Sequence, residues 1–168
     1  MIKRLVLIRG LPGSGKSEIA KQIKKKHKDS AFICATDDYW VRPDGKYDFN
    51  IDLLGNSHAW NQNRVKSTLV FESGSSWDSI VVVDNTNINF SEIRPYAILA
   101  EKFEFPVAVL EPNTKWAMDV EKCYELNTHG VPYATILRMY HNWEKTEEVI
   151  SKIQQLGCKI ADKVEYSL

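Results

Sequence analysis

The chain has 168 residues, of which 43% are apolar and 26% charged, the composition of one ordinary globular domain with a buried core. Basic and acidic residues both count 22, so the formal net charge is zero and gives no general affinity for nucleic acid. No apolar run reaches the roughly 20 residues that cross a bilayer, and the N-terminus does not have the pattern of a signal peptide. The three cysteines lack the spacing of metal ligands, which favours reduced thiols. We expect a single domain over residues 1–168 that is cytoplasmic, of cellular or viral origin, and has no membrane partner.

Apolar patterns along the chain alternate between those of strands and those of helices. In order, they predict strand 2–9, helix 16–28, strand 30–36, a loop or short hairpin at 41–50, helix 52–72, strand 79–84, helix 92–103 capped by Ser91, strand 105–110, and helices 114–126, 133–144 and 146–156. The inner side of helix 52–72 is expected to carry Leu53, Leu54, Ala59, Trp60, Val65, Leu69 and Val70. This alternation predicts an α/β domain: a mainly parallel sheet of four to five strands with helices on both faces.

A glycine-rich loop, GLPGSGKS at residues 10–17, lies between the first predicted strand and the first predicted helix. Its spacing is that of the Walker A phosphate loop, in which backbone N–H groups and the helix N-terminus face phosphate oxygens. The lysine neutralises the charge of the β- and γ-phosphates, and the hydroxyl after it can ligate magnesium. The sequence therefore predicts a site for ATP or GTP with Mg²⁺, formed by Leu11, Pro12, Gly13, Ser14, Gly15, Lys16 and Ser17.

Three acids, Asp37, Asp38 and Asp84, follow predicted strands at the edge of the sheet where the phosphate loop lies. Such carboxylates can hold magnesium or deprotonate an acceptor hydroxyl, and Asp84 is the expected metal ligand after a Walker B-like strand. Asp38 could equally cap a helix or pair with a lysine. Asn85 and Asn87 could orient either a metal-bound water or the loop after the strand. Because no glutamate follows Asp84 to activate water, the pattern favours phosphoryl transfer over hydrolysis.

Two further segments are expected at the same edge. The aromatic residues around 39–49 could stack on a base or simply pack their loop, namely Tyr39, Trp40, Tyr47 and Phe49. The polar break LNTHGVPY at 126–133 is typical of a lid that closes over a nucleotide. His129 or Arg138 is the available lid cation, although a structural role for Arg138 remains open.

Taken together, these motifs resemble a known family. They are RGLPGSGKS at 9–17, ATDDYW at 35–40, DGKYDFN at 44–50, LGNSHAWNQNR at 54–64, VVVDNTN at 81–87 and NTHGVPYATILRMYHNWE at 127–144. The chain resembles the kinase domain of bacteriophage polynucleotide 5′-hydroxyl kinases, and more closely the polynucleotide-kinase-like proteins related to the NEDD4-binding kinase domain. The resemblance covers residues 2 to about 145.

The resemblance implies a kinase that moves the γ-phosphate of ATP or GTP to the 5′-hydroxyl end of RNA or DNA. Lys16 and Ser17 would hold the triphosphate and magnesium, Asp37 would be the general base, and residues 126–138 would form the lid with Arg138 as a catalytic cation. The implied acceptor-side residues are Asp38, Trp40, Arg42, Asp84, Asn85, Asn87 and His129.

The chain departs from the family pattern at two positions. The phage kinases have an arginine where this chain has Trp40, with Arg42 two places on, and Leu126 stands where a lid arginine is expected. Two other functions therefore remain open: a kinase for a small-molecule hydroxyl (a nucleoside, a sugar or an antibiotic), and a nucleotide-binding module whose catalysis has decayed.

Overall fold

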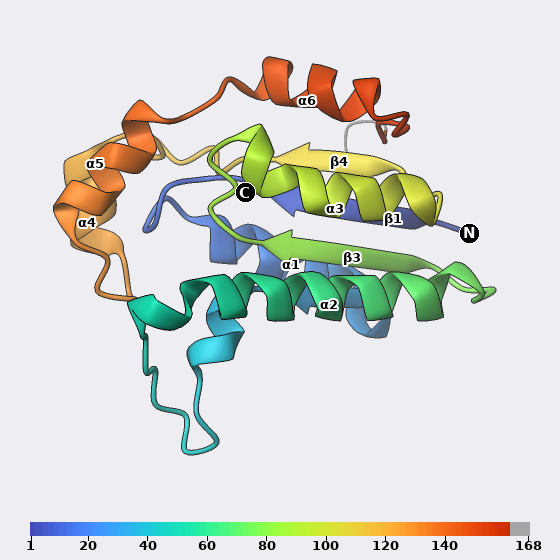
Figure 1. Cartoon of the computed structure of the whole chain (residues 1–168), viewed down its shortest axis with the longest axis horizontal. Helices are drawn as coiled ribbons and strands as arrows, with labels where there is room; N and C mark the ends of the chain where they lie inside the picture. The colour runs from blue at the N-terminus through green and yellow to red at the C-terminus, as the bar shows by residue number, and fades with distance from the viewer. Residues whose placement is uncertain (162–168) are drawn as a thin grey trace.

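The computed structural model describes residues 1–161, and its centre is a parallel β-sheet (Figure 1). The strands are β1 (Lys3–Ile8), β2 (Ala31–Cys34), β3 (Ser79–Asp84) and β4 (Val107–Leu110), in the order β2-β3-β1-β4. Every neighbouring pair is parallel, with β1 and β3 in register from Lys3 opposite Ser79 to Ile8 opposite Asp84. Ile160 adds a single parallel bridge to Val107, in the place of a fifth strand. The predicted sheet is confirmed.

The six α-helices of the described chain cover both faces of this sheet, as predicted (Figure 1). They are α1 (Lys16–His27), α2 (Leu54–Ser73), α3 (Phe90–Lys102), α4 (Val120–Leu126), α5 (Tyr133–His141) and α6 (Thr146–Gln155). Short 3₁₀ turns occur at η1 (Lys28–Ser30), η2 (Thr36–Trp40) and η3 (Ile51–Leu53). No helix within residues 1–161 combines the length and the apolar character that spanning a bilayer requires.

The core lies in two layers because successive strand residues point to opposite faces. On one face Leu5, Leu7, Val81 and Val83 pack with side chains of α2, α3 and α6. On the other face the strands pack with Ile19, Ala20 and Ile23 of α1. Burial on both faces explains why the strands read as continuous apolar runs.

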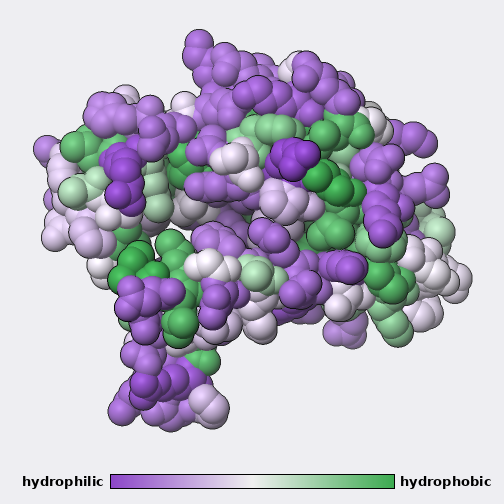
Figure 2. All heavy atoms as spheres, viewed as in Figure 1, coloured by the Kyte–Doolittle hydropathy of each residue, from purple (hydrophilic) through white to green (hydrophobic). Residues whose placement is uncertain are grey.

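The expected inner face of α2 is largely wrong. Of the seven residues named for it, only Val65 and Leu69 are buried. The buried stripe instead continues through Ser57, Asn61 and Glu72, whose spacing of three or four residues keeps them on one side of the helix. Asn61 is tolerated there because its amide donates to the backbone oxygen of Cys34 and to the hydroxyl of Tyr96. The displaced apolar residues remain on the surface, where Figure 2 shows hydrophobic side chains around the start of α2.

Two helix starts also differ from prediction. Helix α3 begins one residue before Ser91, since the Asn89 side chain accepts from the backbone N–H groups of Ser91 and Glu92 and is therefore the cap. Helix α4 begins at Val120 rather than near residue 114, with Asp119 as its cap. Residues 114–119 are not helical and contain a turn at 115–118, and two of their side chains bind the phosphate loop, as described below.

Candidate active site

The phosphate loop connects β1 to α1, which is the strand–loop–helix arrangement that its sequence predicts. Gly15 is the residue before α1, and Lys16 and Ser17 form the first turn of the helix. The N–H groups of that turn have no partner within the helix, so they present positive charge to a bound anion. The Ser17 side chain is exposed, and Lys16 Nζ donates to the backbone oxygen of Leu11 at 2.9 Å. The arrangement suits a phosphate group.

Side chains from the segment that follows β4 bind the backbone carbonyl groups of the phosphate loop. The hydroxyl of Thr114 donates to the backbone oxygen of Ser14 at 2.8 Å, and the indole N–H of Trp116 donates to that of Gly13 at 3.2 Å. Side chains 100 or more residues away therefore bind the carbonyl side of the loop. The sequence analysis missed both residues, because their segment was read as part of a helix.

Helix α4 ends directly against the same loop. Gly13 has a φ of +78°, and a Cβ atom there would lie 2.1 Å from the backbone oxygen of Cys123 and 2.8 Å from the backbone nitrogen of Asn127. Leu11 is buried in one apolar cluster with Ile88, Cys123 and Ile136, the last from α5. The predicted lid, residues 126–138, thus begins where α4 packs on the phosphate loop (Figure 1).

Asp84, the last residue of β3, lies close enough to Lys16 for their charges to interact. Burial raises the pKa of the Asp84 carboxyl, while Lys16 acts in the opposite direction. Burial likewise lowers the pKa of the Lys16 ammonium, against the opposing effects of Asp84 and Asp37. Each group is charged at some cost, and each lowers that cost for the other. Asp84 and Asp37 therefore lie at the edge of the sheet that also carries the loop lysine, where the sequence predicts the strand-end acids.

Asp37 lies in η2, just beyond β2, with a half-exposed carboxylate. Its Oδ1 accepts a hydrogen bond from the hydroxyl of Tyr47 at 3.1 Å, and its Oδ2 lies 3.8 Å from Nε2 of His129. His129 comes from the predicted lid, so the lid and the 41–50 hairpin meet at this carboxylate. Asp38 instead forms an ion pair with Arg64 of α2 at 2.5 Å. An ion pair was one of the roles expected for Asp38, although with a lysine as the partner.

The side chains of the two asparagines after β3 bind the backbone of neighbouring segments. The Asn85 side chain accepts from the backbone N–H of Thr36 at 2.9 Å and thereby fixes the start of η2. The Asn87 side chain is buried and donates to the backbone oxygen of Ile8 at 2.7 Å. Both side chains therefore set the position of neighbouring backbone.

The aromatic residues of the hairpin region mainly pack on one another. Trp40 is 4% exposed, and its ring lies 5.1 Å from that of Phe49 and 4.9 Å from that of Tyr39. Of the two roles expected for Trp40, packing of the loop is therefore the one observed. Arg42 forms an ion pair with Asp48 inside the hairpin, which Val41 and Tyr47 close by an antiparallel bridge.

The lid residues differ in where their side chains lie. His129 reaches the Asp37 carboxylate, whereas Arg138 lies on an exposed position of α5 and Leu126 is 43% exposed at the end of α4. The Asn127 side chain ties the turn together by accepting from the N–H of Val131 at 2.8 Å. Of the two lid cations expected, His129 is the one that this arrangement brings to the acid.

Arg9 is a buried cation that the sequence analysis gave no role. Its guanidinium donates to the backbone oxygens of Asn87, Ile88 and Glu144 at 2.7–2.8 Å, lies 3.4 Å from the Glu111 carboxylate, and stacks 4.2 Å from the Trp143 ring. It joins the strand before the phosphate loop to the segment that follows α5. The signal available in the sequence was a charged residue at the end of an otherwise apolar strand, directly before the glycine loop.

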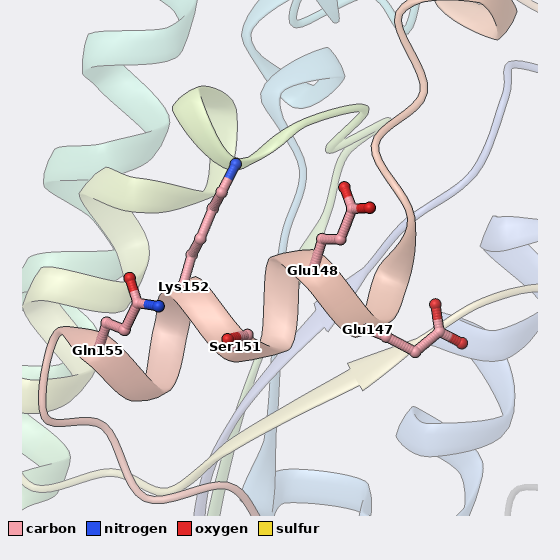
Figure 3. Close-up of a pocket in the computed structure, with 5 residues that line it drawn as sticks. All are labelled: Glu147, Glu148, Ser151, Lys152 and Gln155. Atoms are coloured by element: carbon pink, nitrogen blue, oxygen red, sulfur yellow. The ribbon is translucent and has the colours of Figure 1, made fainter.

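A shallow depression on α6 lacks comparable chemistry. Figure 3 shows the side chains that line it, which are Glu147, Glu148, Ser151, Lys152 and Gln155. All five come from one helix, and Lys152 pairs with Glu144. Substrate sites usually join groups from several elements, as the edge around Lys16 does.

Magnesium was expected at Ser17 and Asp84, and the donors present fit it. Within residues 1–161 no group of three or more His, Cys, Asp or Glu side chains could hold a metal ion. Mg²⁺ in nucleotide sites usually takes one or two protein oxygens, with phosphates and water completing its shell. An exposed hydroxyl and one carboxylate suit that pattern.

Similarity to known proteins agrees with this geometry. Residues 5–125 match the family model of the AAA domain. The chain is 38% identical over 161 residues to human NEDD4-binding protein 2, covering 96% of this chain and 8% of that protein. The chain spans between 8% and 41% of the lengths of the first four curated relatives that it matches.

Solved structures share the fold at low identity. The Pnkp1/Rnl/Hen1 RNA repair complex matches with a TM-score of 0.63 and 13% identity, covering 90% of this chain and 46% of that chain. Chaetomium thermophilum Kti12 in complex with ADP-AlF3 matches with a TM-score of 0.56 and 13% identity, over 94% and 100%. A gluconokinase from Sinorhizobium meliloti matches with a TM-score of 0.52 and 15% identity, over 93% of both chains. The resemblance drawn from the motifs is confirmed: the chain belongs to the AAA domain family and has the α/β fold of phosphate-loop kinases.

Proposed function

We propose that this protein transfers the γ-phosphate of ATP or GTP to the 5′-hydroxyl end of a polynucleotide. The observation that carries the proposal is the meeting of Lys16 with Asp37 and Asp84 at one edge of the sheet, where their charges interact. A loop built for phosphates and a half-exposed carboxylate beside it are what phosphoryl transfer to a hydroxyl requires.

The donor would lie along the phosphate loop, with the backbone of residues 11–15 around its phosphates. The Lys16 ammonium would neutralise the charge of the β- and γ-phosphates, and its hydrogen bonds to phosphate oxygens would replace the one that it donates to the backbone oxygen of Leu11. Ser17 and Asp84 would hold Mg²⁺, which supplies further charge neutralisation when bound. The solved Kti12 complex with ADP-AlF3, which shares the fold, supports nucleotide binding by this chain.

Asp37 is the proposed general base. As the acceptor oxygen attacks, its proton passes to Asp37 and a new oxygen–phosphorus bond forms at the γ-phosphate. The bond between that phosphorus and the β–γ bridging oxygen breaks, and the nucleoside diphosphate leaves with the electron pair. His129 beside Asp37 and Arg138 on α5 are the proposed lid cations, and His129 has the closer approach to the site.

A polynucleotide acceptor is supported by the motif resemblance to polynucleotide kinases and by the fold shared with a chain of the Pnkp1/Rnl/Hen1 RNA repair complex. Asp38 and Arg42 lie in ion pairs on the acceptor side, next to Asp37 and in the hairpin respectively. The aromatic residues around Trp40 would shape the wall of that side, with Trp40 packed beneath its surface.

The direct test is transfer of label from γ-labelled ATP or GTP to a 5′-hydroxyl oligonucleotide, RNA or DNA, with Mg²⁺. Lys16→Ala should abolish transfer, and Asp37→Asn should lower kcat by about 10²–10⁴-fold, the usual contribution of a general base. Transfer by Lys16→Ala at the wild-type rate would overturn the site assignment.

The same assay separates the other functions. A panel of nucleosides, sugars and antibiotics that accepts phosphate in preference to the oligonucleotide would indicate a small-molecule kinase. Tight nucleotide binding without turnover, unaffected by Asp37→Asn, would indicate a binding module with decayed catalysis.

A further inference from the structure

The hairpin between η2 and η3 returns Tyr47 to the start of η2. Its backbone is closed by the Val41–Tyr47 bridge, by a hydrogen bond from the N–H of Arg42 to the oxygen of Lys46 at 2.9 Å, and by one from the N–H of Asp48 to the oxygen of Trp40 at 2.8 Å. The residues on both sides of Tyr47 are therefore bonded to backbone at the end of η2 and just after it. A side chain on a hydrogen-bonded hairpin is held more firmly than one on an open loop.

The two oxygens of the Asp37 carboxylate are not equivalent. Oδ1 accepts the hydroxyl proton of Tyr47 at 3.1 Å, a hydrogen-bonding distance. Oδ2 lies 3.8 Å from Nε2 of His129, which is too long for a hydrogen bond. The rings of Tyr47 and His129 lie 4.7 Å apart, so the tyrosine touches the carboxylate and the lid together. One oxygen is thus occupied, and the other remains available to an incoming hydroxyl.

The direction of this hydrogen bond is well determined. Burial, and then the negative charge of Asp37, raise the pKa of the Tyr47 phenol well above its ordinary value. Tyr47 therefore keeps its proton at neutral pH and remains the donor. The backbone beneath Asp37 is fixed separately, since the Asn85 side chain accepts from the N–H of Thr36.

We propose that Tyr47 is a positioning residue for phosphoryl transfer, holding Oδ1 of Asp37 so that Oδ2 takes the proton from the acceptor hydroxyl. This inference rests on the proposed function. It follows the general arrangement in which a base is itself oriented by a third group. The acceptor proton moves to Oδ2, the acceptor oxygen bonds to the γ-phosphorus, and the diphosphate departs with the electrons of the broken bond.

The test begins with Tyr47→Phe, which removes the hydroxyl and keeps the ring that contacts His129. We expect kcat for the 5′-hydroxyl oligonucleotide to fall by about 10- to 100-fold, the scale of a misplaced catalytic group. KM for the oligonucleotide and for the nucleotide should stay within about twofold, because an interaction used in the transition state affects kcat. Tyr140→Phe, at an exposed tyrosine of α5, is the matched control and should retain the wild-type kcat.

A double mutant distinguishes positioning from a general loss of structure. If Tyr47 acts through Asp37, Tyr47→Phe should cost nothing further in an Asp37→Asn protein, because the group that it orients is gone. Equal melting temperatures for Tyr47→Phe and the wild type would complete the expected result.

Different results would overturn the proposed kinase function and the positioning role of Tyr47. No transfer by the wild type, or full activity in Asp37→Asn, overturns the proposed function and this inference with it. If the wild type is active and Asp37→Asn is impaired, the inference alone is overturned by an unchanged kcat in Tyr47→Phe, by a change confined to KM, or by an equal fold loss in both backgrounds.

Discussion

Gly13 provides a quantitative test of how the lid is joined to the phosphate loop. Replacing it with alanine puts a methyl group 2.1 Å from the backbone oxygen of Cys123, well inside any real contact distance, and 2.8 Å from the backbone nitrogen of Asn127. These neighbours are main-chain atoms at the end of α4, so no side-chain rotation can relieve the clash. Either α4 or the loop has to move.

The structure offers a control that separates this clash from backbone strain. Gly45, at the tip of the hairpin, has a φ of +81°, close to the +78° of Gly13, but nothing lies within 4 Å of its added Cβ. The left-handed conformation alone should cost Gly45→Ala about 1–2 kcal/mol. Gly13→Ala should add about 1–3 kcal/mol for overpacking, giving about 2–5 kcal/mol in total.

At about 2–4 °C per kcal/mol for a protein of this size, Tm should fall by about 2–8 °C in Gly45→Ala and about 4–20 °C in Gly13→Ala. Thermal unfolding followed by circular dichroism measures both. Titration with a fluorescent ATP analogue should show weaker binding for Gly13→Ala but not for Gly45→Ala, because only the first change introduces a clash at the phosphate loop. If the two variants lost the same stability, the close packing of α4 on the loop would be refuted.

Two further predictions concern buried charge. Arg9→Leu should lower the free energy of unfolding by about 3–5 kcal/mol in urea denaturation, because it leaves three backbone oxygens and Glu111 without their cation. The control, Arg94→Leu at an exposed position, should change the free energy of unfolding by less than about 0.5 kcal/mol. Similar losses in both variants would contradict the role given to Arg9. Burial puts the folded-state pKa of Asp84 above its unfolded value, so the charged carboxylate opposes folding. This destabilisation is absent below the unfolded pKa, grows as the pH rises from the unfolded to the folded pKa, and is complete above the folded pKa. Asp84→Asn should therefore raise Tm at neutral pH by about 2–4 °C for each kcal/mol of this charge-burial cost that it removes, and phosphate transfer should fall. The gain in Tm should shrink as the pH falls toward about pH 4. A gain that grew on acidification would show that the charged carboxylate does not oppose folding.

The strand–loop–helix unit and the sheet were predictable because their signals are local. A continuous apolar strand can be read from adjacent residues, and the glycine and lysine spacing of the phosphate loop is set by the backbone that it must form. The acids after β2 and β3 were placed correctly for the same reason: parallel strands end at one edge, so Asp37 and Asp84 must meet there.

The prediction failed where a residue's partner is distant in sequence. The polar stripe of α2 is buried because Asn61 finds Cys34 and Tyr96 across the core, which hydrophobic periodicity cannot anticipate. Thr114 and Trp116 bind loop carbonyls about 100 residues away, and nothing near them in sequence marks that role.

The sequence alone therefore determined the fold class, the phosphate loop and the family, all of which depend on order and spacing along the chain. Only the tertiary structure decided which groups touch Asp37: Tyr47 from the hairpin and His129 from the lid, while Trp40 turns inward. The physical reason is that hydrogen bonds and charge interactions fall off within a few ångströms, so the neighbours of a catalytic group are set by packing in three dimensions.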